Sequence, residues 1–525
     1  LEFRRVLFRS QWVREDGGEA GLHPSNIHDN AYAVGTLDLT GDQSILLGPD
    51  GPSLGGFVCS VTTAKGEMRN LGQLHPGDKV HFRLLDLDQA KEIREAEEAN
   101  LRHEYQEVVL PEQKDLDYHY AILAEETAAG TKIVARLDGE DNILVEYGEM
   151  ELDIAIRFRV HVLMQELKKK DLPVIDLTPG IRSLQIHFDI EKISLKEMLA
   201  AVLETNRTLP ELSDVTVPSR IIWLPLSWDD PQTQLAAKRY QQTVRPNAPW
   251  CPSNPEFIRR INGLDSIEDV KKIVFDADYL VLGLGDVYLG APVATPVDPR
   301  HRMVTTKYNP ARPWTPENAV GIGGAYLCVY GMEGPGGYQF VGRTIQMWNP
   351  LKETEYFKHG KPWLLDFFDQ IRFYPVSAEE ILKDREDFLR GRFKIKIEET
   401  SFNLGKYEQF LKEHEDTIRA FKDHQEASFE AERKMWKEKG LDEFDSETQD
   451  APAIVEETVP DGCEAARTNI PGSVWKVLVE DGQKVREGDT LVILESMKME
   501  FPVTAEYSGT IEKVYLKPGE QVNSG

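Results

Sequence analysis

A duplicated pattern near the end of the chain constrains its fold more than any other feature. Glycines, lysines and apolar residues of one copy recur in a second copy at a constant offset of 37 residues. Each copy predicts a strand, a tight glycine turn and a second strand, so the pair indicates a small quasi-symmetric β-sandwich. The paired positions are Gly472 and Gly509, Val474 and Ile511, Lys476 and Lys513, Val477 and Val514, Val479 and Leu516, Gly482 and Gly519, Val485 and Val522, and Gly488 and Gly525.

Lys498 lies at the midpoint of this repeat, between Met497 and Met499. The symmetry places the lysine on the hairpin turn that joins the two halves. Such a mounting suits a lysine that carries a chemical group between active sites, because a carrier holds its cofactor at a rigid, exposed tip. An ordinary lysine on a β-hairpin is the alternative.

The Ser-Met-Lys-Met sequence resembles the biotinylation signature of the biotinyl carrier domain. The resemblance implies that residues 460–525 form a biotinyl/lipoyl-type β-sandwich with biotin bound covalently to Lys498. It also implies a biotin protein ligase as a partner. Lipoyl domains share this fold but usually lack the paired methionines, so biotin is the expected cofactor.

Composition excludes several function classes. A chain of 525 residues is expected to hold several domains, and 41% apolar with 29% charged residues is typical of a globular protein. The net charge of −28 disfavours nucleic acids and anionic membranes as partners. Four widely spaced cysteines predict a reducing, cytoplasmic location without structural zinc, and no apolar run reaches the roughly 20 residues that span a bilayer.

The sequence also predicts that both ends of the chain are irregular. Residues 1–10 show no organised pattern, and we expect them to be a non-native leader outside the fold. Gly525 matches Gly488, which is followed by a strand in the first copy. The carrier is therefore expected to stop one strand short, as part of a longer protein.

Residues 11–115 are predicted to be rich in β-strands with glycine turns. Two imidazoles, a carboxylate, two amides and a phenol occur between His23 and Tyr32, and glycines cluster between residues 48 and 56. Glycines allow backbone N–H groups to approach a ligand, although turns capped by Asn and Asp explain the same pattern. A metal site through His23 and His28 is disfavoured, because no further ligands have suitable spacing.

These segments also carry a family resemblance. HPSNIHDNAYAVG, LTGD and GPDGPSLGGFVC, between residues 23 and 59, look like the second half of the allophanate-hydrolase-subunit-2-like subdomain of urea carboxylase. PGGYQFVGRT, from residue 335 to 344, looks like the subunit-1-like subdomain, expected over 116–400. The resemblance implies a mainly β fold with helices (α+β), in which cyclophilin-like β-barrel carboxyltransferase subdomains enclose the active site.

Local patterns predict several elements within 118–375. Residues 143–147 and 181–188 are expected to be strands, and helices should start at Ser194, by its capping box, and at Pro231. Residues 152–167 alternate like a strand but also repeat like a helix; length and the lysines that follow favour a helix. The glycines at 283–290 lack the third glycine and the strand-helix context of a dinucleotide-binding loop.

Residues 401–439 are predicted to form an exposed amphipathic helix that packs on the barrels, with a dimer contact as the alternative, so an oligomer is possible. An acidic, flexible linker up to residue 459 follows. A tether before a carrier domain allows biotin to move between active sites.

The chemistry implied by the resemblance is carboxyl transfer from carboxybiotin to urea, which yields allophanate. ATP, Mg and bicarbonate would act only through a separate biotin carboxylase domain, and an allophanate hydrolase, fused or separate, would consume the product. A guanidine carboxylase is the alternative enzyme. A non-catalytic, carboxyltransferase-like regulatory subunit is the alternative from another class, which the intact Met-Lys-Met disfavours.

Urea is neutral and presents four N–H donors and one carbonyl, so its site needs acceptors and a donor. Asp286 is the candidate acceptor, Asn30 can donate and accept, and Tyr32 could complete the set. A capping aspartate and a core tyrosine are the alternatives. The resemblance places Asn30 where urea-type enzymes have Asn and guanidine-type enzymes Asp.

Three further residues are candidates for contacts with carboxylated biotin. Gly323 and Gly324 could donate backbone N–H groups to its ureido oxygen, and Arg343 could hold the carboxyl group. Simple turns and a structural ion pair are the alternatives. No metal site is predicted.

Overall fold

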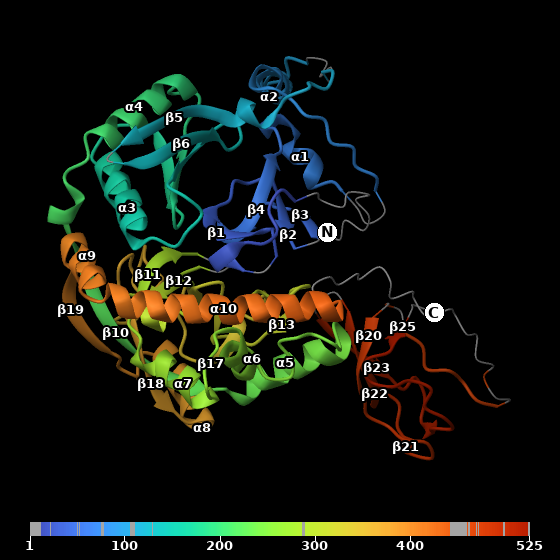
Figure 1. The fold of residues 1–525 in the computed structure, drawn as a ribbon. Helices are drawn as coiled ribbons and strands as arrows, with labels where there is room; N and C mark the ends of the chain where they lie inside the picture. The colour runs from blue at the N-terminus through green and yellow to red at the C-terminus, as the bar shows by residue number, and fades with distance from the viewer. Residues whose placement is uncertain are drawn as a thin grey trace.

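The computed structural model describes residues 12–522 except 22, 42, 50, 52, 75–77, 106–110, 129, 286–288, 442–458, 460–461, 469, 471 and 497–498. Figure 1 shows a small β-sheet and an α+β unit above a closed barrel, with the carrier domain beside the barrel. Among the described residues no helix is both long and apolar enough to cross a membrane. The fold class is confirmed as mixed α+β with a β-barrel and a biotinyl-type sandwich.

The first sheet has the strand order β1-β4-β2-β3. Its β-strands and the helical segments around it are η1 (Gly18–Ala20), β1 (Asn26–Ala31), β2 (Thr36–Thr40), β3 (Gln43–Leu46), β4 (Leu54–Thr62), η2 (Lys65–Glu67), α1 (Met68–Leu71) and α2 (Leu87–Leu101). The 15-residue helix α2 was not anticipated in this β-rich region. Its sequence signal is a capping box in which Asp86 accepts from the Gln89 backbone and the Gln89 side chain accepts from Asp86.

The second sheet is antiparallel with the order β5-β6-β7-β9-β8, and two helices pack against it. The elements are η3 (Tyr118–Ala121), β5 (Ile122–Ala128), β6 (Thr131–Leu137), β7 (Asn142–Tyr147), α3 (Ile154–Lys168), β8 (Val174–Pro179), β9 (Ser183–Phe188) and α4 (Leu195–Arg207). The predicted strands and the Ser194 capping box are confirmed. Helix α3 is also confirmed, and its mixed pattern has a cause: Val160 and Leu163 face this sheet's core, while Phe158 and Val162 pack in a separate apolar cluster with Leu280 and Leu282 of the barrel strand β11.

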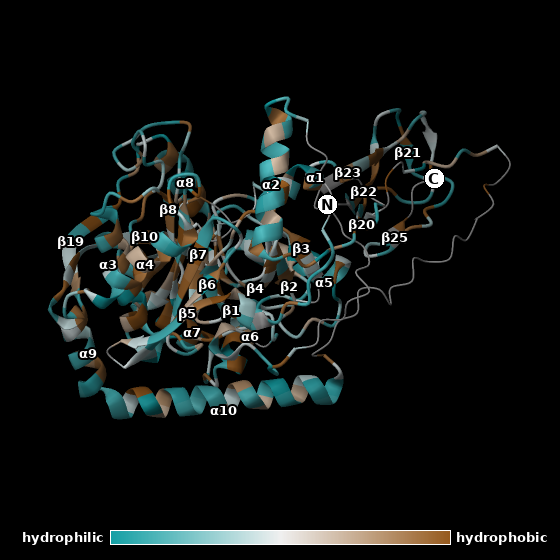
Figure 2. Ribbon diagram, turned by 90° about the horizontal axis from the view of Figure 1, so that it is seen from above, coloured by the Kyte–Doolittle hydropathy of each residue, from teal (hydrophilic) through white to brown (hydrophobic). Residues whose placement is uncertain are grey.

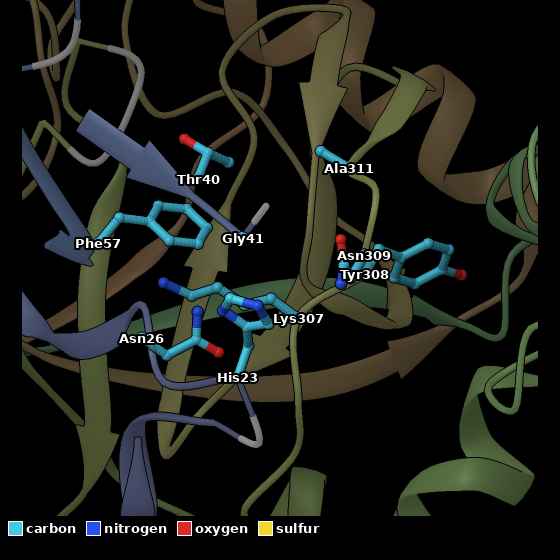
Figure 3. Close-up of a pocket in the computed structure, with 9 residues that line it drawn as sticks. All are labelled: His23, Asn26, Thr40, Gly41, Phe57, Lys307, Tyr308, Asn309 and Ala311. Atoms are coloured by element: carbon cyan, nitrogen blue, oxygen red, sulfur yellow. The ribbon is translucent and has the colours of Figure 1, made fainter. Parts of the chain in front are cut away.

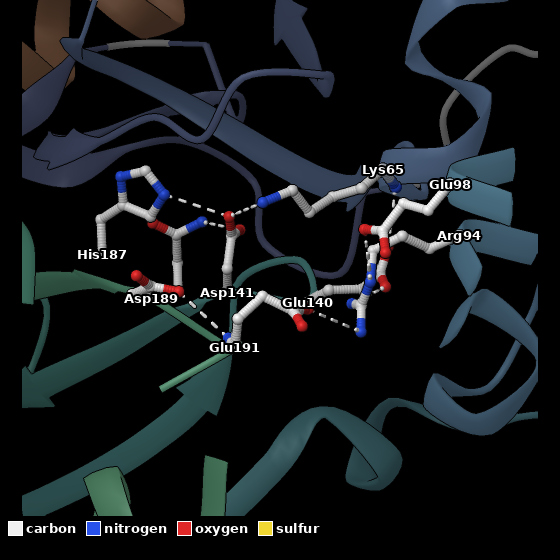
Figure 4. A network of polar contacts seen from close by, with 9 residues as sticks. Lys65, Arg94, Glu98, Glu140, Asp141, His187, Asp189 and Glu191 are labelled. Atoms are coloured by element: carbon white, nitrogen blue, oxygen red, sulfur yellow. Dashed lines mark hydrogen bonds and ion pairs between the residues drawn. The ribbon is translucent and has the colours of Figure 1, made fainter. Parts of the chain in front are cut away.

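A polar network fastens the first sheet to the second (Figure 4). Lys65 Nζ contacts Asp141 Oδ2 at 2.5 Å, and His187 Nε2 contacts the same carboxylate at 3.0 Å. Arg94, on α2, pairs with Glu140 at 2.8 Å. Helix α2 therefore links the first sheet to the second through this ion pair.

Seven strands close into a barrel in the order β17-β14-β15-β12-β11-β18-β10, and β19 adds to β10 from outside. Every pairing is antiparallel except that of β10 with β18. The strands are β10 (Thr216–Trp228), β11 (Tyr279–Leu284), β12 (Pro292–Pro296), β14 (Ala319–Gly323), β15 (Tyr326–Val329), β17 (Gln339–Arg343), β18 (Gln370–Val376) and β19 (Lys396–Asn403). Their inward residues form the largest apolar cluster, so the barrel is a packed core rather than a pore.

Helices and short segments cover the barrel (Figure 1). They are η4 (Leu212–Asp214), α5 (Pro231–Thr243), α6 (Asn254–Ile261), α7 (Ile267–Asp276), η5 (Pro299–His301), α8 (Ala378–Leu389) and the strand pair β13 (Arg312–Thr315) and β16 (Gly334–Gly336). Helix α5 starts at Pro231 as predicted, with Asp230 as its N-cap. Helix α5 and strand β13 are in contact.

The predicted helix at 401–439 is two helices, α9 (Leu404–Glu413) and α10 (Glu415–Lys439). Residues 401–403 belong to β19, and Asn403, its last residue, is the N-cap of α9. Figure 2 shows α10 running along one side of the molecule with mostly hydrophilic residues. Its Glu432 pairs with Arg260 at 2.7 Å, and its Trp436 stacks on Phe257, so packing on the barrel is confirmed.

The carrier domain has the predicted two-fold symmetry. Gly472 pairs with Val522, and the equivalent residues 37 positions away, Gly509 and Val485, pair with each other. Its strands are β20 (Gly472–Val477), β21 (Lys484–Val485), β22 (Thr490–Ser496), β23 (Met499–Thr504), β24 (Gly509–Thr510) and β25 (Gln521–Val522). The strand predicted after Gly509 is present but short: β24 has two residues, whereas the equivalent strand β20 has six.

Candidate functional site

The glycine pair Gly55–Gly56 on β4 organises the place where the first sheet meets the barrel. A Cβ on Gly55 would lie 2.5 Å from the hydroxyl oxygen of Tyr32. A Cβ on Gly56 would lie 2.4 Å from Lys307 Nζ and 2.5 Å from Asp29 Oδ1. The two glycines therefore admit a phenol and a pair of opposite charges. In the sequence these glycines suggested close approach of a ligand, whereas the described structure uses them for side chains of the protein.

Lys307 reaches this place from the segment that follows β12 and η5, and its side chain is buried. Its Nζ donates to the Gly56 carbonyl at 3.1 Å and lies 4.4 Å from the centre of the Phe57 ring. Asp29, on β1, is also buried. A buried ammonium requires acceptors and negative charge around it, which the carbonyl, the aromatic ring and the carboxylate supply.

Asp38, on β2, is a further buried carboxyl near the lysine. Burial raises its pKa to about 6, against the opposing effects of the Thr40 hydroxyl and the charge of Lys307. Thr40 donates to its Oδ2 at 3.0 Å. A carboxyl with such a pKa can take up and release a proton near neutrality, which is the property required of a general acid or base.

A small pocket lies beside these charges, between the first sheet and the barrel (Figure 3). Figure 3 shows the side chains of His23, Asn26 and Lys307 gathered near Phe57. The pocket has amide, imidazole and ammonium groups next to an aromatic wall, and the space between them, about 10 Å³, is that of one water molecule. Its lining is completed by Thr40, Gly41, Tyr308, Asn309 and Ala311.

The strand end that carries Asn30 meets the barrel strand that leads to Asp286. Asn30 pairs with Gly55, and its Oδ1 accepts a hydrogen bond from Ser183. On the barrel side, a Cβ on Gly285, at the end of β11, would lie 3.2 Å from Ser53 Oγ. Asp286 itself lies outside the described residues, but the residue before it lies next to the β1–β4 edge.

Arg157, on α3, is another charged group at this edge that sequence reasoning missed. It is fully buried, and its Nε donates to the Leu282 carbonyl of β11 at 2.6 Å. Its guanidinium lies over the rings of Phe367 and Phe368, while Nη1 and Nη2 have no hydrogen-bond partner among the described residues. Burial lowers its pKa to about 9.

Tyr32 and the two histidines of this region have structural partners. The Tyr32 hydroxyl accepts from the Phe57 backbone N–H at 2.8 Å, and burial raises its pKa well above the usual range. His28 Nδ1 lies 2.5 Å from the Tyr326 hydroxyl, and burial lowers its pKa to about 4. His23 instead contacts Ser25. Tyr32 thus has the contacts of a core tyrosine, and the separate partners of the histidines do not resemble a metal site.

The residues expected to contact carboxylated biotin are placed elsewhere on the barrel. Gly323 ends β14 and pairs with Tyr326, and Gly324 lies in the β14–β15 turn, where it has a φ of +58° and packs against the Ala20 carbonyl. Arg343 ends β17, donates to the Glu317 carbonyl at 2.8 Å, and has its pKa lowered by burial and by Arg385. These contacts match a turn and a structural polar cluster, and a role toward biotin stays a prediction.

The carrier hairpin has the geometry that a lysine-linked cofactor needs. Strands β22 and β23 pair up to Ser496 and Met499, and Met497 and Lys498, which lie between them in the chain, are outside the described residues. The side chain of Met499 is likewise not described. Strand β22 of this hairpin also pairs with β20, and its residues Leu491, Val492 and Leu494 belong to the apolar core, so the described residues fit a biotin attachment domain.

Three family models match successive parts of the chain. Residues 5–84 match subdomains A and B of the carboxyltransferase domain, and 133–357 match its subdomains C and D. Residues 458–525 match the model of biotin-requiring enzymes. The fold, the carrier hairpin and these matches define a carboxyltransferase domain followed by a biotin carrier domain.

Comparison with individual proteins narrows the class. The chain is 38% identical over 98% of its length to the urea amidolyase of Lachancea kluyveri, and 31% identical over 98% to a putative urea carboxylase of Emericella nidulans. The crystal structure of Kluyveromyces lactis urea carboxylase superposes with a TM-score of 0.84 at 36% identity, covering 98% of this chain and 45% of that one. The chain belongs to the urea carboxylase family. It spans 28% and 44% of the two curated relatives.

Proposed function

We propose that this chain performs the carboxyl-transfer half of a biotin-dependent carboxylation of urea to allophanate. The observation that carries the proposal is the contact of the carrier with the barrel, at the segment that also lines the pocket: Glu495, on the carrier hairpin, reaches Arg239 next to Trp314. The same segment, residues 307–314, supplies Lys307 to the pocket. The carrier is therefore seated on the segment of the barrel that leads from the pocket.

Biotin, when bound at Lys498, supplies a labile carboxyl group and a ureido nitrogen. When that carboxyl group passed to a urea nitrogen, the ureido nitrogen would take in exchange the proton that urea loses. The protein's part is to position urea, exclude water and stabilise the negative charge that develops.

Asn30 favours urea over guanidinium as the ligand. Because its Oδ1 is held by the Ser183 hydroxyl, its NH₂ group is left to donate to a carbonyl oxygen. Urea has such an oxygen, whereas guanidinium presents donors only. We assign the oxygen of urea to Asn30 and its N–H groups to Asp286. Guanidine remains the alternative substrate.

The proposal places the chain within a larger, cytoplasmic enzyme. A biotin carboxylase domain would consume ATP and bicarbonate with Mg, a biotin ligase would modify Lys498, and an allophanate hydrolase would remove the product. The test is urea-dependent ATP cleavage by the full-length protein, with Lys498→Arg as the inactive control. ATP cleavage that does not respond to urea, with a fully biotinylated protein, would refute the proposed substrate.

A further inference from the structure

Arg239, on α5, joins the carboxyltransferase domain to its carrier. Its guanidinium carbon lies 4.4 Å from the ring centre of Trp475, on carrier strand β20, and 5.0 Å from that of Trp314, on β13. Its Nη2 contacts Glu495 Oε2 at 3.3 Å. We call these four residues, Arg239, Trp314, Trp475 and Glu495, the carrier latch.

The latch is desolvated. The side chains of Arg239 and Glu495 are each only 9% exposed. Arginine suits such a place because its flat, delocalised cation stacks on aromatic rings and still pairs with a carboxylate. A charge pair excluded from water also discriminates between partners, because a carrier without the acid would take away the carboxylate that faces a buried guanidinium.

Other described contacts join the carrier to the same face of the barrel. Carrier strand β20 contacts α5. A Cβ on Gly519, in a carrier turn with a φ of +92°, would lie 2.9 Å from the Gln242 carbonyl at the end of α5. Ala236, Tyr240, Thr243, Arg312 and Pro313 line a second small pocket with Arg239, Trp314 and Glu495.

The latch also holds the carrier hairpin close to its turn. Glu495 pairs with Glu500 in the β22–β23 ladder, one step before the pair Ser496–Met499. Holding Glu495 therefore holds the base of the turn that contains Lys498. On the barrel side, Trp314 lies in the segment whose earlier residues, 307–311, line the site pocket.

We propose that the carrier latch is a recognition site for a biotinyl domain with an acidic residue three positions before its modified lysine and a tryptophan on the facing strand. It selects this carrier and holds the base of its β22–β23 hairpin against the barrel. The inference rests on the proposed function, which names the reaction, but docking is measurable without any reaction. Arg239 acts as a positioning residue.

Docking is tested in the intact, biotinylated chain labelled with 5-fluorotryptophan, with the Trp475 signal assigned by Trp475→Phe. The ¹⁹F line of Trp475 is expected to be as broad as that of the buried Trp250, because the docked carrier tumbles with the barrel. Arg239→Met should narrow it at least twofold, and Arg239→Lys should have an intermediate effect. Arg259→Met, which removes an ion pair with Glu256 on the neighbouring helix α6, is the matched control. An unchanged line in Arg239→Met overturns the latch.

The functional arm uses the full-length enzyme. Two rates are measured in Arg239→Met and in wild type: urea-dependent ATP cleavage through the tethered carrier, and carboxyl transfer to urea from free carboxylated biotin. The factor by which the variant lowers the first rate should be at least ten times the factor by which it lowers the second. An equal fall of both overturns the positioning role. If wild type transfers nothing to urea from either donor, the proposed function fails, while the ¹⁹F result still decides whether the latch exists.

Discussion

Replacing Gly56 by alanine tests the arrangement of buried charge at the site. The added Cβ would lie 2.4 Å from Lys307 Nζ, 2.5 Å from Asp29 Oδ1 and 3.0 Å from the Ile27 carbonyl. Carbon atoms do not approach other heavy atoms so closely, so the ammonium, the carboxylate or the strand has to move. Lys307 and Asp29 are both buried, which leaves them little room to do so.

The expected loss of stability follows from two effects. Overfilling a packed site costs about 1–3 kcal/mol, and separating a buried charge from its partner costs roughly 3–5 kcal/mol. Because Nζ lies at the end of a side chain that can swing partly aside, we expect Gly56→Ala to cost about 2–4 kcal/mol. Urea-dependent turnover should fall as well, since Lys307 lines the pocket.

The assay is guanidinium chloride unfolding followed by circular dichroism, with Gly72→Ala as the control. A Cβ on Gly72 would meet only the Arg69 carbonyl, at 3.7 Å. A double-mutant cycle identifies the cause: in a Lys307→Met background, Gly56→Ala should cost at least 1 kcal/mol less than in wild type. Strictly additive costs would refute the argument that the lysine is what the methyl group displaces.

Three further predictions follow from the site and the carrier. Lys498→Arg should abolish biotin labelling by a biotin ligase; a labelled peptide elsewhere in the chain, seen by mass spectrometry, would contradict the assignment. Asn30→Asp should shift the ratio of kcat/KM values from urea toward guanidine in the full-length enzyme, and an unchanged ratio would mean that Asn30 does not touch the substrate. His28 has a folded pKa of about 4, below its unfolded value, so it contributes stability that is present above about pH 6.5 and lost as the pH falls toward 4. The loss should reach about 3 kcal/mol. In His28→Asn the free energy of unfolding should therefore depend less on pH over this range, and a pH dependence equal to that of wild type would contradict the prediction.

The carrier domain was the most predictable part of the structure. Its 37-residue repeat constrains both the strand pairing and the position of the hairpin. The structure agrees, since Gly472 pairs with Val522 and the equivalent residues of the other copies, Gly509 and Val485, pair in the same way. Capping boxes and proline positions predicted helix starts equally well. The repeat did not predict the length of the strand after Gly509, because similar sequences in the two copies do not require β-ladders of equal length.

The site residues were harder to predict, because the contacts that make the site are distant in sequence. Lys307 lies 251 positions from the carbonyl it contacts, and Arg239 lies 256 positions from Glu495. Neither has a local motif, although Lys307 is the only charged residue between Arg302 and Arg312, which hints at burial. Asn30 was found by family resemblance, and its hydrogen bond to Ser183 agrees with the proposed role.

Helix α10 has a consequence for how strongly the carrier needs to bind. With 25 residues it is about 37 Å long. Just beyond its end, the carbonyl of Leu441 accepts from Arg245, two residues after the last turn of α5. About 30 residues then separate Leu441 from the first carrier strand, a contour of at most about 100 Å. A carrier leaving the latch therefore stays within a small search volume centred near its dock, and its effective concentration there is of the order of millimolar. Affinity for the dock can be correspondingly weak, which permits rapid release in every catalytic cycle.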